Sequence, residues 1–336
     1  MEFVEQVVSA EEKSSIIQDA FDNSRLNLII FPTEQCNFRC TYCYEDFKIG
    51  KMKPELVSSI KKLISRRAPQ LSSLEFSWFG GEPLLAFNSI IEILEYTNSL
   101  SQDFPNFTNF SNITTNAYSL SVSRFTKLVN NNVKVFQISI DGDNLIHNKT
   151  RTLKNGGATF EKIWKNLKAI KETNLEFEII LRIHYHPNNA EKMEPLISKL
   201  NSDFYDERFK FYFKAIEDLG GKNSVNIKRM MPNEKLKIKK HLESLVLNRN
   251  QIFDLKNSYV CYASKPNSIA IRGDGTLAKC TVALDKEENK LGNINLDGTL
   301  NIDSEKLKYW MSGFENWEVN KLACPHKANE IVPNNM

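Results

Sequence analysis

The sequence predicts an α/β fold, a partial (β/α)6 TIM-like barrel followed by a small module that contains β-hairpins. Two observations predict it. Apolar, β-rich runs alternate with helix-like segments along most of the chain, and beyond about residue 250 two hairpin patterns replace this alternation. Successive strand–helix units imply parallel strands joined by right-handed crossovers. Eight units would close a barrel, so six leave it open on one side.

The barrel elements follow one another in a regular order. Runs that read as strands cover residues 26–31, 74–79, 110–115, 133–140, 177–185 and 209–216. Segments with helical periodicity cover residues 55–66, 89–100, 121–130, 160–172, 190–200 and 233–247. In folds of this kind the residues that carry chemistry gather at the carboxyl ends of the strands.

The C-terminal part has a different pattern. "SIAIRGDGTLAKC" predicts a hairpin with a Gly-Asp-Gly turn at 273–275, and "LGNINLDGTLNI" predicts a second hairpin-like piece. We therefore divide the chain into four predicted segments. They are an N-terminal helical extension (1–24), the barrel (25–220), a bridging helix (221–250) and the C-terminal module (251–336).

Composition narrows the class of protein. The 336 residues are 41% hydrophobic and 25% charged, as in a globular domain, and the formal net charge of +3 is too small to favour nucleic acid or a membrane surface. The basic stretch 228–241 has the spacing of the wet face of a helix. The N-terminus has no apolar signal-peptide region, and no run approaches 18 apolar residues. We expect a cytoplasmic protein that binds neither a membrane nor nucleic acid.

Six cysteines carry the strongest chemical signal. Cys36, Cys40 and Cys43 are bunched in "EQCNFRCTYCY", directly after the first strand, and three more are dispersed near the C-terminus. Disulfide frameworks belong to short secreted chains, so metal or cluster ligation is the better interpretation. A zinc site usually has a second close cysteine pair, and a four-iron cube normally takes four cysteines. A cube held by three has an open position, which is typical of catalysis.

The C-x3-C-x2-C spacing after the first strand of a six-unit α/β chain resembles the radical S-adenosylmethionine (radical SAM) superfamily. The resemblance implies that Cys36, Cys40 and Cys43 hold a [4Fe-4S] cluster. It also implies that S-adenosylmethionine occupies the open iron through its amino and carboxylate groups. One electron from the cluster then cleaves the sulfonium, and a 5′-deoxyadenosyl radical abstracts hydrogen from the substrate.

Three further motifs stand at the ends of the next strands. "WFGGEPLL" is similar to the family's Gly-Gly-Glu-Pro motif, in which Gly80 and Gly81 allow close backbone approach and Glu82 receives the methionine ammonium. "TTNA" and "SIDG" are similar to family positions near the nucleoside and the methionine carboxylate. Because side chains alternate along a strand, Ser139 and Asp141 are expected to point the same way and to reach one ligand together. The resemblance thus adds these cofactor-binding candidates: Thr115, Asn116, Ser139 and Asp141.

Other side chains near the predicted site are less specific. Arg151 is expected to bind the cofactor carboxylate with its planar fork or to make a structural salt bridge, and Arg182 to do similar work from the fifth strand. The family uses the backbone at the position of Tyr42 to touch adenine, while its side chain packs. His184 and His186 are core or solvated histidines, or one acts as a general base.

A second cysteine trio resembles an auxiliary-cluster module. Cys261-x13-Gly275-x4-Cys280 is similar to the start of the family's SPASM module, which is called Twitch when shortened. With Cys324 this chain has three of the seven cysteines of the full form, so the resemblance implies one auxiliary [4Fe-4S] cluster. Its fourth ligand is open: His326, water, a carboxylate or the substrate. A zinc site and buried free thiols are the alternatives for this trio.

The resemblance to peptide and protein maturases implies an enzyme that makes an oxidative modification, such as a crosslink, in a peptide or protein. If all six thiols bind iron, none remains to return a hydrogen atom, which disfavours epimerisation unless Cys324 is unligated. The alternatives are a radical SAM enzyme for a small molecule or nucleotide, and a non-catalytic Fe–S electron-transfer protein. About 25 residues precede the first strand, so we expect no leader-binding domain and a separate leader-binding partner instead. A flavodoxin- or ferredoxin-like protein is the expected electron donor.

Overall fold

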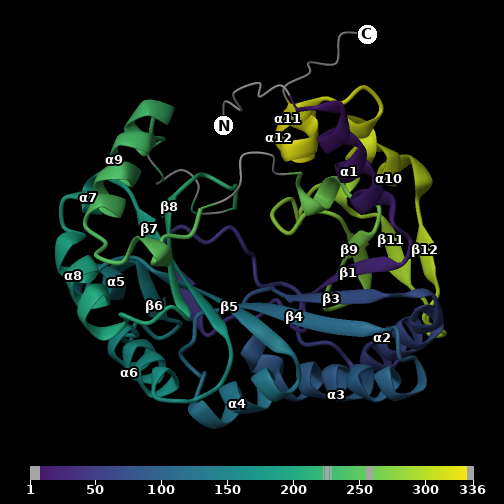
Figure 1. Ribbon diagram of the computed structural model, residues 1–336, viewed down its shortest axis with the longest axis horizontal. Coiled ribbons are helices and arrows are strands. Elements are labelled where there is room, and N and C mark those ends of the chain that lie inside the picture. Colours follow the sequence, from purple (N-terminus) through teal and green to yellow (C-terminus); the bar gives the residue numbers. More distant parts are fainter. Residues whose placement is uncertain (1–7, 222, 224–226, 228, 255–259, 331–336) are drawn as a thin grey trace.

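The computed structural model describes residues 8–221, 223, 227, 229–254 and 260–330. Its main feature is a curved sheet of ten strands in the order β12-β11-β10-β9-β1-β3-β4-β5-β7-β8 (Figure 1). Helices cover the outer side of this sheet, and its two end strands, β12 and β8, are not paired with each other, so the barrel is open on one side. This arrangement confirms the partial barrel.

Six neighbouring strands form the parallel part of the sheet, and they confirm the six predicted strands to within two residues at each end. Each pairs in parallel with the next. Their bounds are β1 (Arg25–Ile30), β3 (Ser73–Trp78), β4 (Thr108–Thr115), β5 (Val133–Ile140), β7 (Glu178–Tyr185) and β8 (Phe209–Ala215).

The connecting helices confirm five of the six predicted segments. They are α2 (Pro54–Arg67), α3 (Phe87–Asp103), α4 (Val122–Asn130), α6 (Phe160–Lys171), α8 (Glu194–Asp203) and α9 (Pro232–Ser244). The single helix predicted at 190–200 is wrong, because α7 (Pro187–Ala190) ends there and α8 starts anew at Glu194. Pro195 stands in the first turn of α8, where its missing N–H is tolerated, whereas within a continuous helix it would break a hydrogen bond. Among the described residues, no helix combines the length and apolar character needed to cross a bilayer.

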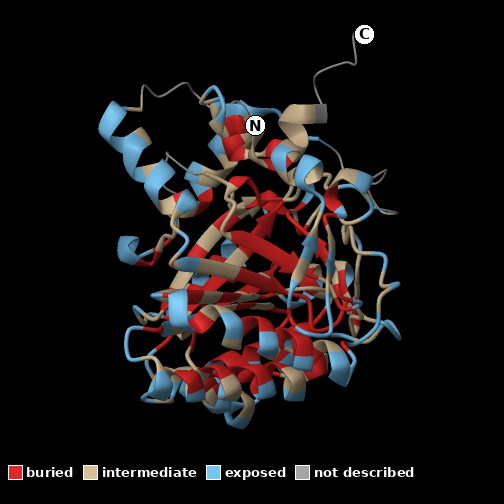
Figure 2. Cartoon of the chain, turned by 90° about the vertical axis from the view of Figure 1, so that its right-hand side faces the viewer, coloured by how far each residue is buried: buried red, intermediate tan, exposed pale blue. Residues whose placement is uncertain are grey.

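The two faces of the sheet differ in polarity. In β3, Leu74, Phe76 and Trp78 are fully buried and share one hydrophobic core with residues of α2 and α3. Alternate side chains point to the opposite face, where Asn112 of β4 donates hydrogen bonds to Glu75 at 2.9 Å and to a neighbouring serine. Figure 2 shows the buried sheet and the buried inner flanks of the helices. The apolar face therefore holds the fold together, and the polar face lines the inside of the barrel.

Both predicted C-terminal hairpins are confirmed, but they join the main sheet. The hairpins consist of β9 (Ser268–Ile271) with β10 (Thr276–Ala278) and β11 (Gly292–Ile294) with β12 (Leu300–Ile302). β9 pairs in parallel with β1, on the edge of β1 that β3 does not occupy. The first strand of the barrel is thus also the strand to which the C-terminal part is attached. The proposed domain boundaries remain predictions.

Short helices surround this C-terminal sheet edge. α10 (Ser304–Met311), α11 (Val319–Ala323) and α12 (Pro325–Glu330) follow β12. α1 (Ala10–Phe21) begins with a Ser9–Glu12 capping box and packs beside them (Figure 1). The ring of Phe21 meets that of Phe314 edge-on at 5.2 Å, and Lys265 contacts Asp19 at 2.6 Å. The predicted N-terminal helix is therefore present and is held by the C-terminal part of the chain.

The sequence did not predict a small second sheet. β2 (Phe38–Cys40) pairs antiparallel with β6 (Arg151–Leu153), which follows the short helix α5 (Asn144–Thr150). Three-residue strands are too short to show a period. This sheet matters for the site, because it fixes the loop that carries the first cysteines.

Candidate functional site at the carboxyl ends of the strands

The structure brings the first cysteine trio together beyond the end of β1. Cys40 ends β2, and the backbone N–H of Cys43 donates to its carbonyl at 3.2 Å. Burial raises the pKa of Cys36, and the charges of Glu82, Cys40 and Cys43 raise it further. Burial also raises the pKa of Cys43 to about 12, with Cys40 as the next cause. Because the charge of each thiolate raises the pKa of its neighbours, all three cysteines can be ionised at neutral pH only with a positively charged partner.

The segment that contains Cys36, Cys40 and Cys43, which we call the cysteine loop, is fixed by backbone pairing. Cys40 is opposite Arg151 in the small sheet, and the N–H of Thr41 donates to the carbonyl of Thr150 at 2.9 Å. The sulfur of Cys36 receives the N–H of Phe38 at 3.3 Å. The loop is therefore an ordered segment attached to the barrel, in the place where the sequence predicted it.

The Gly-Gly-Glu motif lies directly against this loop. A Cβ on Gly80 would stand 2.3 Å from the carbonyl oxygen of Thr33, and one on Gly81 would stand 2.6 Å from the carbonyl oxygens of Glu34 and Gln35. No real Cβ tolerates such distances. The two glycines are thus required for the close approach that the sequence predicted for them.

Glu82 and the end of β4 form one hydrogen-bonded unit. The Glu82 carboxylate is fully buried and accepts from the hydroxyl of Thr115 at 2.7 Å, the N–H of Asn116 at 2.7 Å and the N–H of Leu84 at 3.0 Å. Burial raises the pKa of Glu82, although these three bonds oppose the rise. The motifs after β3 and β4, which the sequence could place only at neighbouring strand ends, are in direct contact.

Asp141 is the centre of a second buried unit. Its Oδ1 accepts from the hydroxyl of Tyr42 at 2.8 Å and lies 3.1 Å from Nδ1 of His184, while its Oδ2 accepts from Thr150 at 2.6 Å. Arg151 in turn donates to the hydroxyl of Tyr42 at 2.9 Å. The Tyr42 side chain therefore does more than pack, because it joins the cysteine loop to the ends of β5 and β7.

Charges in this unit follow from burial and pairing. Burial alone would raise the pKa of Asp141, but the hydrogen bond to His184 and the charge of Arg151 hold it well below its usual range. Burial lowers the pKa of His184 to about 4, although Asp141 opposes this. At neutral pH the contact is thus a hydrogen bond from a neutral imidazole to a carboxylate. This geometry makes His184 a support for Asp141.

Two predicted residues stand apart from these units. Arg182 of β7 has a shielded Nε without a partner, and its guanidinium makes no hydrogen bond or ion pair with any described residue. The side-chain hydroxyl of Ser139, its neighbour in register on β5, likewise has no hydrogen-bond partner among the described residues. Because both Asp141 oxygens already bind protein groups, a shared ligand for Ser139 and Asp141 remains a prediction. Within the described part of the chain, no carboxylate lies within ion-pair distance of the Arg182 guanidinium.

The second cysteine trio is also gathered in space. Burial raises the pKa of Cys261 to about 12, and the neighbouring charges of Cys280 and Cys324 raise it further. The N–H of Cys261 donates to the carbonyl of Leu322 at 2.9 Å, which attaches this segment to α11 near Cys324. The side chain of Lys279, which donates to two backbone carbonyls, is almost fully buried beside the trio. Cys261 and Cys324, which are 63 positions apart in the chain, thus belong to one cluster of thiols with Cys280.

The cysteines are not arranged for a single ion. Within the part of the chain that the structure describes, no three His, Cys, Asp or Glu side chains converge as ligands of one metal. A zinc ion holds its thiolates about 2.3 Å from one point, whereas the cysteines of a multi-iron cluster bind different irons. The zinc alternative for the second trio remains a prediction.

A cavity of about 950 Å³ lies between the two cysteine regions. Residues of the cysteine loop, the segment after β8 and the C-terminal part line it, among them Tyr44, Glu45, Glu217, Arg272, Leu284 and His326. Burial raises the pKa of Tyr44, and the charges of Glu45, Cys43 and Cys280 raise it further, so this ring is within electrostatic reach of both trios. The sequence placed His326 near the auxiliary site; it lies in the cavity wall, and its role as a ligand remains a prediction.

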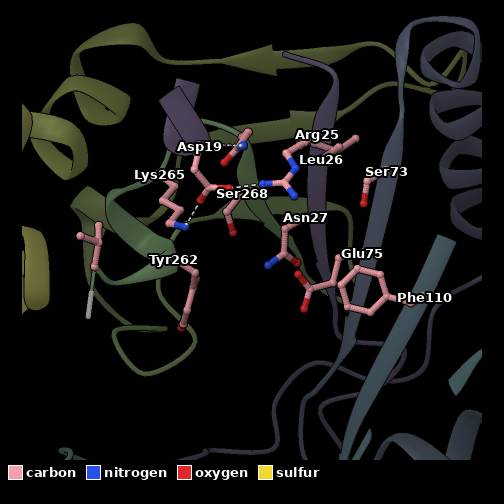
Figure 3. Close-up of a pocket in the computed structure, with 12 residues that line it drawn as sticks. Asp19, Arg25, Leu26, Asn27, Ser73, Glu75, Phe110, Tyr262, Lys265 and Ser268 are labelled. Atoms are coloured by element: carbon pink, nitrogen blue, oxygen red, sulfur yellow. Dashed lines mark hydrogen bonds and ion pairs between the residues drawn. The ribbon is translucent and has the colours of Figure 1, made fainter. Parts of the chain in front are cut away.

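A smaller cavity, of about 300 Å³, opens near the amino ends of β1, β3 and β9 (Figure 3). Asp19 forms part of its wall and pairs with Arg25 and Lys265. Deeper in, Asn27 and Ser268 each have a side-chain oxygen without a hydrogen-bond partner. Unpartnered buried oxygens in a small polar space are ordinary positions for ordered water.

Several residues of the site escaped the sequence analysis. Thr150, Tyr44, Glu45 and the buried pair of Glu34 with Arg272 all contact the cysteine region or line the large cavity. Glu34 did carry a local signal, since it stands two residues before Cys36, and Tyr44 follows Cys43 directly. Nothing in their spacing indicated the distant residues that they meet.

Comparisons with known proteins show the family and the fold. The chain matches the family described as the radical SAM superfamily over residues 30–200. A cysteine-type anaerobic sulfatase-maturating enzyme of Clostridium novyi (strain NT) is 29% identical over 199 residues, which cover 56% of this chain and 48% of that protein. One from Clostridium perfringens (strain 13 / Type A) is 27% identical over 249 residues, which cover 68% and 63%. The chain thus matches about half to two thirds of the length of these relatives.

A solved structure shares the fold. It is described as native anSMEcpe with bound AdoMet and Cp18Cys peptide, and it superposes with a TM-score of 0.62. The alignment covers 84% of this chain and 80% of that one at 23% sequence identity. At this identity the likeness is one of fold.

Proposed function

Because this chain belongs to the radical SAM superfamily, we propose that it is an enzyme that binds S-adenosylmethionine at a [4Fe-4S] cluster and modifies a peptide or protein. The observation that supports this most is that the segment with Cys36, Cys40 and Cys43 packs directly against Gly81 and Glu82 at the carboxyl ends of the strands. The peptide or protein substrate is proposed from the relatives, which are named as sulfatase-maturating enzymes.

The donor set fits the cluster. The first trio offers three thiols, and charged groups close to them include Glu82, Asp141, Arg151 and Glu45. Because the pKa of each of these thiols is raised, the thiols need a positively charged partner in order to ionise at neutral pH. An iron–sulfur core supplies that charge and stabilises thiolates. Cys36, Cys40 and Cys43 would hold the cluster.

The surrounding residues fit S-adenosylmethionine. A carboxylate has about four lone-pair positions, and Glu82 uses three of them within the protein. The position that remains would accept the methionine ammonium, and the unpaired guanidinium of Arg182 would meet a carboxylate. Bound together, the cluster and S-adenosylmethionine supply one-electron chemistry, the abstraction of hydrogen from the substrate.

The chain's own residues orient and shield this site. Thr115 and Asn116 hold the Glu82 carboxylate from the end of β4, so its direction is set before any ligand arrives. Tyr42, Asp141 and Arg151 hold the cysteine loop from the other side. Glu82, Asp141 and the residues Thr115, Asn116 and Arg151 are buried, whereas Tyr42 is only half-buried. Burial strengthens the electrostatic effect of these groups on a bound ligand.

The second trio supports an auxiliary cluster and an oxidative outcome. Cys261, Cys280 and Cys324 would hold it, with His326 as one candidate for the fourth ligand. Such a cluster would supply an acceptor for one electron. Loss of a hydrogen atom, an electron and a proton from the substrate would be a net loss of two hydrogens. A flavodoxin- or ferredoxin-like protein would supply the first electron. All six cysteines are free, which fits a reducing compartment such as the cytoplasm.

One experiment tests the proposal. Anaerobically reconstituted protein is reduced with S-adenosylmethionine present, and 5′-deoxyadenosine is quantified against a Cys36→Ala control. Release that depends on Cys36 supports the proposed chemistry, whereas iron–sulfur absorbance without release would favour an electron-transfer protein. Mass spectrometry of candidate peptides then looks for a loss of two hydrogens. Unchanged mass with deuterium uptake from solvent would indicate epimerisation instead.

A further inference from the structure

A buried ion pair joins the C-terminal hairpin to the loop that carries the first cysteine trio. Nε of Arg272 donates to one carboxylate oxygen of Glu34 at 2.9 Å, and its Nη2 donates to the other at 2.7 Å. This is the parallel two-bond geometry for which a guanidinium is suited and an ammonium is not. The Glu34 side chain is 1% exposed and that of Arg272 is 12% exposed. We call this contact the Glu34–Arg272 pair.

The same guanidinium holds a third segment. Its Nη1 donates to the carbonyl of Leu284 at 2.9 Å, four residues beyond Cys280. Glu34 stands two residues before Cys36. One side chain therefore contacts both the segment that leads into the first cysteine trio and the segment that follows a cysteine of the second.

Close backbone packing leaves the Glu34 segment little room to move. On one side a Cβ on Gly81 would lie 2.6 Å from the Glu34 carbonyl oxygen, and the N–H of Glu82 donates to Gln35 at 3.0 Å. On the other side Arg272, which precedes Gly273 at the β9–β10 turn, binds both oxygens of the Glu34 carboxylate. The segment lies between the Gly-Gly-Glu loop and the β9–β10 hairpin.

Burial decides how much the pair contributes. Exposed ion pairs change stability little, but removing one partner of a buried pair leaves an uncompensated charge and is strongly destabilising. Without Arg272 the Glu34 carboxylate would have no ion-pair partner among the described residues. We therefore expect its segment, which leads directly to Cys36, to be less firmly held. We propose that Arg272 is a positioning residue for the first cysteine trio, acting from the C-terminal module through Glu34. This inference rests on the proposed function of that trio as a cluster site.

The test isolates the first site. In the full chain Cys261, Cys280 and Cys324 are replaced by Ala, so that any remaining cluster belongs to the first trio. Arg272→Gln, Arg272→Lys and the double variant Glu34→Gln/Arg272→Gln are compared in this background. Arg66→Gln is the matched control, because Arg66 also links the barrel to the C-terminal strands, through Asp297, but is 55% exposed. The readouts are hydrogen exchange of residues 33–46 in iron-free protein and the electron paramagnetic spectrum with and without S-adenosylmethionine.

We expect Arg272→Gln to speed exchange across 33–46 by about tenfold or more and to reduce the spectral change caused by S-adenosylmethionine. Arg272→Lys should fall between the parent and Arg272→Gln, because it keeps the charge but loses the fork. The double variant should exchange more slowly than Arg272→Gln, and Arg66→Gln should match the parent. Should Arg272→Gln not fold, the other two Arg272 variants decide.

The possible failures are distinct. Exchange and spectra in the Arg272 variants that match those of Arg66→Gln would overturn the inference and leave the proposed function intact. A parent that binds no iron–sulfur cluster would refute the proposed function. In that case the exchange measurement on iron-free protein still decides whether Arg272 orders the cysteine loop.

Discussion

At the scale of single residues, the site depends on buried polar groups whose partners are already in place. Glu82 and Asp141 are both fully buried, and each carboxylate binds at least three groups of the protein. Burial of this kind is costly unless hydrogen bonds compensate for it. Two substitutions separate the roles of these groups. A change at Glu82 should alter the affinity for a ligand, and a change in the hydrogen bonds around Asp141 should alter stability.

Glu82→Gln should weaken binding of S-adenosylmethionine to the reconstituted protein by about tenfold or more, because a charge-assisted hydrogen bond to the ammonium is lost. Equilibrium binding with anaerobic protein measures it. Glu75→Gln is the control, since Glu75 is another carboxylate inside the barrel that accepts an amide hydrogen bond. Equal affinities in the two variants would refute the assignment of Glu82.

Tyr42→Phe should lower the free energy of unfolding of the iron-free protein by about 1–3 kcal/mol, because a donor to Asp141 and an acceptor for Arg151 disappear together. Denaturant titration measures the change. In Tyr118→Phe the lost hydroxyl has no hydrogen-bond partner among the described residues, so we expect nearly parental stability. A Tyr42→Phe protein as stable as this control would show that the hydrogen bonds of Tyr42 do not contribute to the free energy of unfolding.

At the scale of elements, short loops are held between longer ones by contacts that leave no space for a side chain. The Gly-Gly-Glu loop against the cysteine loop is the clearest case in the site. The end of β8 and the start of α9 are joined differently, by charge. Each junction can be perturbed alone.

Gly81→Ala should reduce the iron and sulfide bound by the first trio, because its Cβ would push the Gly-Gly-Glu loop away from the cysteine loop. Metal and sulfide analysis after reconstitution, in a background without the C-terminal cysteines, gives the answer. Gly50→Ala is the matched control, since a Cβ there meets nothing within 4 Å. If both variants bind iron like the parent, the close approach is not needed for cluster assembly.

Glu217 joins β8 to α9 through Lys214 at 3.2 Å and Lys235 at 2.5 Å. Burial would raise its pKa, but the two lysines lower it from 4.5 to about 2. A lowered folded-state pKa stabilises the protein above the unfolded value and loses this effect as the pH falls. The stability difference between the parent and Glu217→Gln should thus be constant above pH 4.5 and shrink toward pH 2. Chemical denaturation across this range checks it, and two curves that stay parallel would contradict it.

At the scale of the whole molecule, the ten-stranded sheet joins the two parts of the chain that carry the cysteine trios. β1 lies between the barrel strand β3 and the C-terminal strand β9, so the segment leading to the first trio is attached to both parts. The large cavity between the trios is bounded by both parts as well. A substrate in that cavity would be in contact with the surroundings of each trio.

Replacing Cys261, Cys280 and Cys324 by Ala should lower the iron content from about eight to about four per chain, because each cube holds four irons. Replacing the first trio should have the same numerical effect but also abolish release of 5′-deoxyadenosine. Iron analysis and product assays on both variants separate the sites. Loss of all iron from either triple variant would contradict two separately assembled clusters.

The sequence alone determined the strands, most of the helices, both hairpins and the loop that holds the first cysteines, because periodicity and turn residues are local properties. The resemblance of short motifs to those of a known family also indicated Glu82, Thr115 and Asn116, and the motifs stand at strand ends that a parallel sheet brings to one edge. Only the tertiary structure decided that β9 lies beside β1, that Tyr42 binds Asp141, and that Glu34 meets Arg272, 238 residues away. Such contacts depend on how complete elements pack, and no local pattern records which distant partner will satisfy a buried charge.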